Sequence, residues 1–120
     1  MSYDLVFWRQ DHAATAAPEA IYSSLLRGER VDGILDLRVE EFLSAILGTF
    51  SGSVREPNGS EDWVVWVASD EQAMFEVQWS PQHVLVCCRG TSNDTMNDLI
   101  DIAVAHGCRL YDPQVNERFG

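Results

Sequence analysis

The chain has 120 residues, the usual size of one domain, and its 46% hydrophobic and 22% charged residues are typical of a folded protein with its own core. Its charge is unusual, because eight arginines and no lysine stand against 19 acidic residues and leave a formal net charge of −11 at pH 7. This composition excludes Schiff-base catalysis by lysine and the G-x-x-x-x-G-K phosphate loop, and it argues against direct binding to nucleic acid or to an anionic membrane surface.

The first predicted elements are a strand and a helix. Residues 3–9 are rich in aromatic and β-branched side chains, which favours a strand. A helix is predicted from Pro18, which suits the first helical turn, to Gly28, which supplies a C-terminal stop.

The clearest helical pattern lies between Val39 and Phe50, where apolar residues recur at helical spacing. We expect this helix to begin near Asp36 and to end by Phe50. Residues 51–60 contain two glycines and a proline and are predicted to form a loop.

Three consecutive strands are predicted over residues 63–67, 74–79 and 83–89. The polar turns between them are short, which favours an antiparallel meander. A last strand is predicted over residues 108–111, and the polar tail from residue 114 to 120 is expected to run over the surface.

The helix between Gly90 and Gly107 buries an apolar stripe and places three aspartates on its far side. Their spacing of i, i+4 and i+7 aligns them as one acidic ridge, made of Asp94, Asp98 and Asp101.

These elements predict one α+β domain over residues 1–120, in the order β-α-α-β-β-β-α-β. The expected architecture is a two-layer sandwich with a five-stranded mixed sheet and helices mainly on one face. The last helix can act as a crossover that makes the fourth and fifth strands parallel without making them neighbours. Alternation places Trp63 and Trp66 on opposite faces, so at least one tryptophan is expected on the face away from the helices.

The termini and cysteines predict a cytoplasmic protein. The N-terminus lacks a basic leader followed by an apolar run, and no stretch approaches the roughly 18 apolar residues of a membrane helix. The chain has an odd number of cysteines, which are expected to be reduced thiols: Cys87, Cys88 and Cys108.

No catalytic or metal-binding signature is found in the sequence. The G-x-S-x-G elbow, C-x-x-C and H-x-x-x-H patterns are absent, and His83 and Cys87 would lie roughly 13 Å apart along an extended strand. We therefore predict no catalytic residue, no metal and no cofactor. A thiol enzyme that pairs Cys87 or Cys88 with His83 or His106 is the alternative, and His12 falls in an expected loop.

Acidic residues on and beside the predicted meander are the candidate partner-binding groups. Asp70 and Glu71 flank a strand end and Glu76 lies in mid-strand, so these carboxylates are expected to supply charge complementarity, with Trp66 as the aromatic anchor. The acidic ridge of Asp94, Asp98 and Asp101 is the second candidate surface.

Three segments carry a resemblance to known proteins. Residues 3–9 read YDLVFWR, residues 97–101 read NDLID and residues 107–114 read GCRLYDPQ. These segments resemble an uncharacterised family of short bacterial proteins, which implies no particular catalytic residues. In size, acidity and α+β order the chain is also similar to immunity proteins of bacterial toxin systems, which bind and block a cognate toxin in the cytosol.

The sequence therefore predicts a cytosolic immunity protein that neutralises a basic toxin domain through an acidic, aromatic surface. Two alternatives stay open. One is a small enzyme or ligand-binding domain with a carboxylate or thiol pocket, and the other is a homodimer or larger homo-oligomer that pairs the open face of its sheet with itself.

Overall fold

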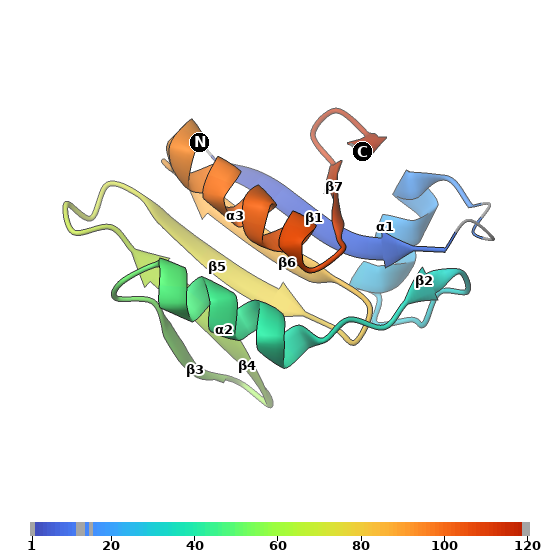
Figure 1. The fold of residues 1–120 in the computed structure, drawn as a ribbon, viewed down its shortest axis with the longest axis horizontal. Coiled ribbons are helices and arrows are strands. Elements are labelled where there is room, and N and C mark those ends of the chain that lie inside the picture. The colour runs from blue at the N-terminus through green and yellow to red at the C-terminus, as the bar shows by residue number, and fades with distance from the viewer. Residues whose placement is uncertain (1, 12–13, 15, 119–120) are drawn as a thin grey trace.

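A computed structural model describes residues 2–11, 14 and 16–118, and within these residues it contains three helices and eight strands (Figure 1). In chain order the elements are β1 (Ser2–Gln10), α1 (Pro18–Leu26), β2 (Ile34–Leu35), α2 (Val39–Thr49), β3 (Val54–Asn58), β4 (Glu61–Val67), β5 (Met74–Trp79), β6 (Val84–Arg89), α3 (Asn93–Ala105), β7 (Arg109–Asp112) and β8 (Glu117–Arg118).

The sheet is antiparallel at every pair of neighbouring strands that the described residues form. Its order is β3-β4-β5-β6-β1-β7-β8, and β2 pairs separately with the end of β1. Strands β6 and β7 run in the same direction, but β1 lies between them and is antiparallel to both. Helix α3 makes the crossover from β6 to β7.

The prediction of a five-stranded mixed sheet in the order β-α-α-β-β-β-α-β was therefore wrong. It omitted β2 and β8, which have two residues each and carry too short a pattern to be seen. It also omitted β3, because Pro57 and the nearby glycines resemble a loop; an edge strand tolerates a proline, since one side of it needs no partner. The sheet is not mixed, because β1 inserts between the two parallel strands.

Two cores lie on opposite faces of the sheet, and both have their apolar centre on β1. Leu5 and Phe7 face a core closed by α2 and α3, whereas Val6 and Trp8 face a core closed by α1. In Figure 1, α2 and α3 lie across one face and α1 lies behind the other. Because successive side chains of β1 point to opposite faces of the sheet, this one strand contributes apolar side chains to both cores.

The helices form where the sequence gives them ends and an apolar face. Pro18 starts α1, and the Ser92 hydroxyl caps α3 by accepting from the Thr95 backbone N–H at 3.2 Å. Helix α2 begins at Val39 rather than near Asp36, because the Leu37 N–H donates instead to the Pro81 carbonyl at 2.8 Å. Within the described residues no helix is long and apolar enough to span a membrane.

Candidate functional site

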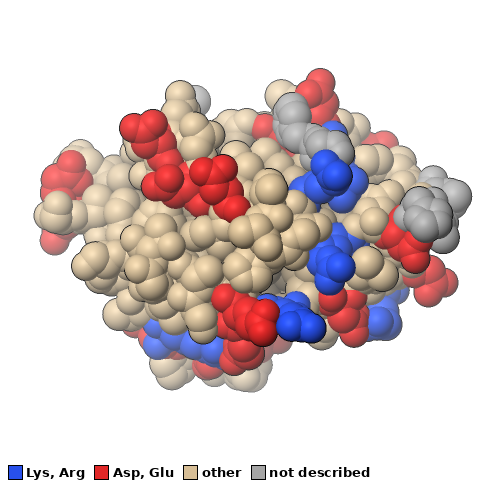
Figure 2. All heavy atoms as spheres, viewed as in Figure 1, with Lys and Arg blue, Asp and Glu red and all other residues tan. Residues whose placement is uncertain are grey.

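The acidic ridge lies on the solvent side of α3, as its spacing predicted. Asp94, Asp98 and Asp101 are exposed, whereas Leu99 and Ala103 on the other side of the helix are fully buried. Figure 2 shows carboxylates gathered over α3 and a second group at the tip of the β4–β5 turn. The ridge is therefore free to meet a partner.

The β4–β5 turn places Asp70 and Glu71 at the same end of the molecule. The Asp70 carboxylate accepts from the Gln72 N–H at 2.9 Å, and Glu71 has a φ of 60°, so the tip is a tight turn. The backbone at Gly90, which leads into α3, packs directly against the Gln72 carbonyl. This contact brings the turn beside the N-terminal end of the ridge.

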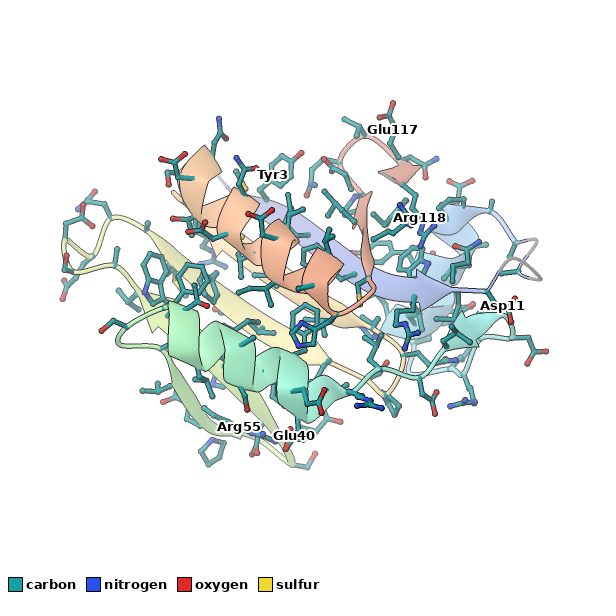
Figure 3. All side chains as sticks on the ribbon, viewed as in Figure 1. Tyr3, Asp11, Glu40, Arg55, Glu117 and Arg118 are labelled. Atoms are coloured by element: carbon teal, nitrogen blue, oxygen red, sulfur yellow. The ribbon has the colours of Figure 1, made fainter. Side chains whose placement is uncertain are left out.

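The arginine–carboxylate ion pairs of the described residues lie elsewhere. Arg55 of β3 bonds Glu40 of α2 at 2.9 Å and Asp62 at 3.1 Å, and Figure 3 shows Glu40 and Arg55 side by side. The remaining pairs are Arg27–Glu29, Arg30–Asp36 and Arg38–Glu41. No residue of the ridge or of the β4–β5 turn takes part, so the negative charge at this end is not neutralised by internal pairing.

Trp66, the predicted anchor, is half-buried on the face of β4 that α2 covers. Its ring faces α2, stacks on Phe75 with centroids 5.2 Å apart, and meets Phe50 at 5.7 Å. Trp63, three residues earlier, lies on the other face of β4, half-buried, and its indole N–H donates to the Glu56 carboxylate at 3.2 Å. Trp63 is therefore the tryptophan of β4 that faces away from α2 and α3.

The strands β3, β4 and β5 expose a surface on this side of the sheet, which we call the open face. The side chains of these strands that lie on it are Val54, Glu56, Glu61, Trp63, Val65, Val67, Met74, Glu76 and Gln78, and Arg89 of β6 follows Met74 in the row of Val67. Cross-strand pairing aligns Val54, Val65 and Glu76 in one row, and the row continues to Cys87 and Asp4. Glu76, predicted from its mid-strand position, thus lies on a different face from the ridge.

The thiols are poor nucleophiles in this fold. Burial raises the pKa of Cys87 to about 12, and the Asp4 carboxylate beside it adds to the rise. Burial also raises the pKa of Cys88 and of Cys108 to about 11. A thiol with such a pKa is protonated at neutral pH, which removes the reactive form.

His83 and Cys87 do not share a site. His83 is buried just before β6 begins, and its Nδ1 lies 2.6 Å from the Ser80 hydroxyl, whereas Cys87 lies four residues further along, roughly 13 Å away in an extended strand, in the row of Glu76 and Asp4. His106 stacks on Phe42 at 5.3 Å, and its Nδ1 bonds the Ile102 carbonyl. His12 lies outside the described residues.

An open groove of about 900 Å³, which we call the His83 groove, lies at the end of the sheet. It runs between the end of α1, the start of α2 and the β5–β6 turn. Charged and aromatic groups line it, including Glu40, Arg55, Asp62, Trp79 and His83. The Arg55 guanidinium also lies over the Trp79 ring at 5.2 Å, so part of this lining is already paired.

No group of three or more His, Cys, Asp or Glu side chains in the described part of the chain could hold a metal ion.

The open face was missed in the sequence because β3 was taken as a loop. The signal for it was present: Gly59-Ser60 is a two-residue hairpin loop, Gly59 at its first position has a φ of +70°, and Asn58 pairs with Glu61 across it.

Comparison with known proteins adds no identity. The chain matches no family model, and neither the curated proteins nor the solved structures give a significant match.

Proposed function

We propose that this chain is a cytoplasmic immunity protein that binds and blocks a basic toxin domain. The observation that supports this most is the exposed acidic end of the molecule, where the ridge and the β4–β5 turn carry five carboxylates without an arginine ion pair among the described residues. A net charge of −11 concentrated in this way attracts a cationic surface over a distance.

The charge pattern fits a toxin that acts on nucleic acid. Such an enzyme needs a positively charged groove to bind phosphates. A row of exposed carboxylates is attracted to that groove, so the acidic end steers this chain toward the surface on which the substrate binds. Because the pKa of each cysteine thiol is raised, the thiols are poor nucleophiles. This supports a binding function over covalent catalysis by cysteine.

The test is a binding measurement with the product of the gene next to this one, expressed as a catalytically dead variant. Affinity and association rate are measured by surface plasmon resonance at 50 and 300 mM salt. We expect a stable complex whose association rate falls with salt. The absence of any complex with the neighbouring product would remove the proposal.

Charge-matched variants distinguish the effect of the acidic end on association from the effect of net charge alone. The triple variant Asp94→Asn, Asp98→Asn, Asp101→Asn removes three charges from the ridge. The control removes three carboxylates near the other end of the molecule, at Glu29, Asp32 and Asp36. We expect the ridge variant to slow association about 10-fold at low salt and the control to slow it much less. Equal effects would show that only total charge matters.

Ligand binding in the His83 groove is the second candidate function, and the size of the groove favours it. It differs from the first in needing no partner protein. Thermal-shift screening of small anions and cations against wild type and Arg55→Gln tests it. A ligand that binds in the groove should raise the melting temperature of wild type but not that of Arg55→Gln, which lacks one of the groove's charged side chains.

A further inference from the structure

The sheet extends beyond the helices on one side. Helix α1 packs over β1, β6 and β7, where it covers Val6, Trp8 and Leu85. Helices α2 and α3 pack on the opposite face. The open face over β3, β4 and β5 therefore lacks a covering helix in the described chain.

This uncovered surface is apolar where an exposed strand would ordinarily be polar. Val54 and Val67 are 49% and 47% exposed, and Trp63, Val65 and Met74 between them are half-buried. Alternation on a solvated sheet face normally places polar side chains at these positions. Trp63 lies between Glu56 and Gln78, next to the two rows that contain the valines and Met74. An exposed apolar surface with a tryptophan at its edge and polar groups around it is typical of a protein-binding surface.

Two carboxylates lie within the open face, and their charge limits which partners can cover it. Glu76 is half-buried next to Val65, with Cys87 and then Asp4 beyond it in the same row, and Glu56 accepts from Trp63. Arg89 is exposed on the same side, beside Met74, but among the described residues it forms no ion pair with Glu56 or Glu76. A neutral cover would therefore take two carboxylates out of water with at most one arginine near them, which is strongly unfavourable. A second copy of this chain would bring further carboxylates to the same place. The cover must therefore supply cations.

We propose that the open face is the main contact surface for the toxin, and that it binds an amphipathic basic segment whose apolar side chains pack on Trp63, Val65 and Val67 while lysine or arginine side chains pair with Glu56 and Glu76. The proposal rests on the proposed function and names the surface and the kind of segment that it binds. Trp63 takes the anchoring role that the sequence assigned to Trp66.

The size of the open face indicates how far the interface extends. Three strands and their neighbour β6 span about 14 Å, and six residues along a strand span about 17 Å. This flat area is well below the roughly 800 Å² that each side of a stable complex buries. The partner must also contact an adjoining surface, and the β4–β5 turn with Asp70 and Glu71 borders the open face directly.

The test uses synthetic peptides, so that it does not depend on finding the toxin. One is an 18-residue amphipathic peptide of leucine and lysine, and the other has the same lysines with serine in place of leucine. Backbone amide shifts of the labelled protein are followed by NMR during titration. We expect the leucine–lysine peptide to bind at least 10-fold tighter and to shift amides of β3, β4 and β5.

Valine-to-threonine variants identify the surface without changing strand preference, because both residues are β-branched. The variant Val65→Thr, Val67→Thr is expected to weaken peptide binding about 10-fold at nearly unchanged melting temperature. The matched control is Val104→Thr, Val115→Thr, which alters two exposed valines outside the open face. The control should bind as wild type does.

Four outcomes would overturn the proposal. Shifts confined to α3 or to the His83 groove, equal binding of the two peptides, or equal effects of the two valine pairs would each show that the open face is not the contact surface. A concentration-dependent dimer in analytical ultracentrifugation, lost in the Val65, Val67 variant, would show that a second copy covers the face. Each of these leaves the proposed function standing, since that is tested by the neighbouring gene product.

Discussion

Acidification should destabilise this protein through His83. The imidazole is 6% exposed, and burial lowers its pKa from 6.5 to about 4. Ser80 Oγ accepts from the Gln82 N–H, so its own proton can be donated to His83 Nδ1, which suits the neutral ring. The folded protein therefore holds this histidine neutral under conditions in which the unfolded chain binds a proton.

The sign and the size of the effect follow from linkage. Above pH 6.5 the ring is neutral in both states and contributes nothing to pH dependence. As the pH falls from 6.5 to 4 only the unfolded state gains the proton, so folding stability decreases over this range. With pKa values of about 4 and 6.5, the free energy of unfolding at pH 5 should be about 2 kcal/mol lower than at pH 7 because of this residue alone.

Urea denaturation at pH 7 and pH 5, followed by tryptophan fluorescence, measures this difference. Other groups also titrate, so the informative quantity is the pH-dependent loss in wild type minus that in His83→Gln, expected to be about 2 kcal/mol. Ser80→Ala is the control: it removes the hydroxyl but keeps the burial that lowers the pKa, so it should lose stability with pH as wild type does. A loss in His83→Gln as large as that in wild type would refute the reasoning.

Three further predictions concern the thiols, the core and one glycine. Iodoacetamide at pH 8 should leave the three cysteines of the native protein unmodified while labelling all of them in urea, and labelling of Cys87 in native protein by mass spectrometry would contradict its raised pKa. Phe75→Ala should lower the free energy of unfolding by about 3–5 kcal/mol, because the ring is fully buried against Phe50 with centroids 5.0 Å apart; a loss below about 1 kcal/mol would show that the core is not packed as described. Gly52 and Gly90 both have positive φ, at +86° and +63°, but a Cβ at Gly90 would meet the Gln72 carbonyl and one at Gly52 meets nothing. Gly90→Ala should therefore melt well below Gly52→Ala in calorimetry, and equal melting temperatures would argue against the close contact.

The long amphipathic elements of this fold could be predicted from the sequence, whereas the short edge strands could not. The stripe from Val39 to Phe50 predicted α2 to within a few residues, because burial of one helix face leaves a strong periodic signal. Strand β3 carries no periodic signal, because residues 54–57 are all exposed, and Pro57 argues against a strand until the edge position is known; its one signal was the turn that follows it. Its pairing with β4 is a tertiary property that composition does not encode.

The candidate surfaces also differ in how far they could be predicted from the sequence. The helical spacing of the ridge was sufficient to predict that Asp94, Asp98 and Asp101 share one exposed side. Alternation placed Trp63 and Trp66 on opposite faces, but it could not say which face the helices cover. That choice depends on α2 packing against Trp66 and Phe75, which leaves Trp63 as the tryptophan of β4 on the face that α2 and α3 do not cover.

The ridge and the open face lie on opposite sides of the sheet, and this arrangement gives them different roles toward one partner. A partner seated on the open face has the sheet and α3 between itself and the ridge, a distance of at least about 10 Å, the usual spacing of packed layers. That exceeds the Debye length of about 8 Å at physiological salt, so the ridge can speed encounter at low salt but adds little to the bound complex. Asp70 and Glu71 border both surfaces, and their substitution by Asn and Gln should therefore raise the dissociation rate, which the ridge variant should leave nearly unchanged.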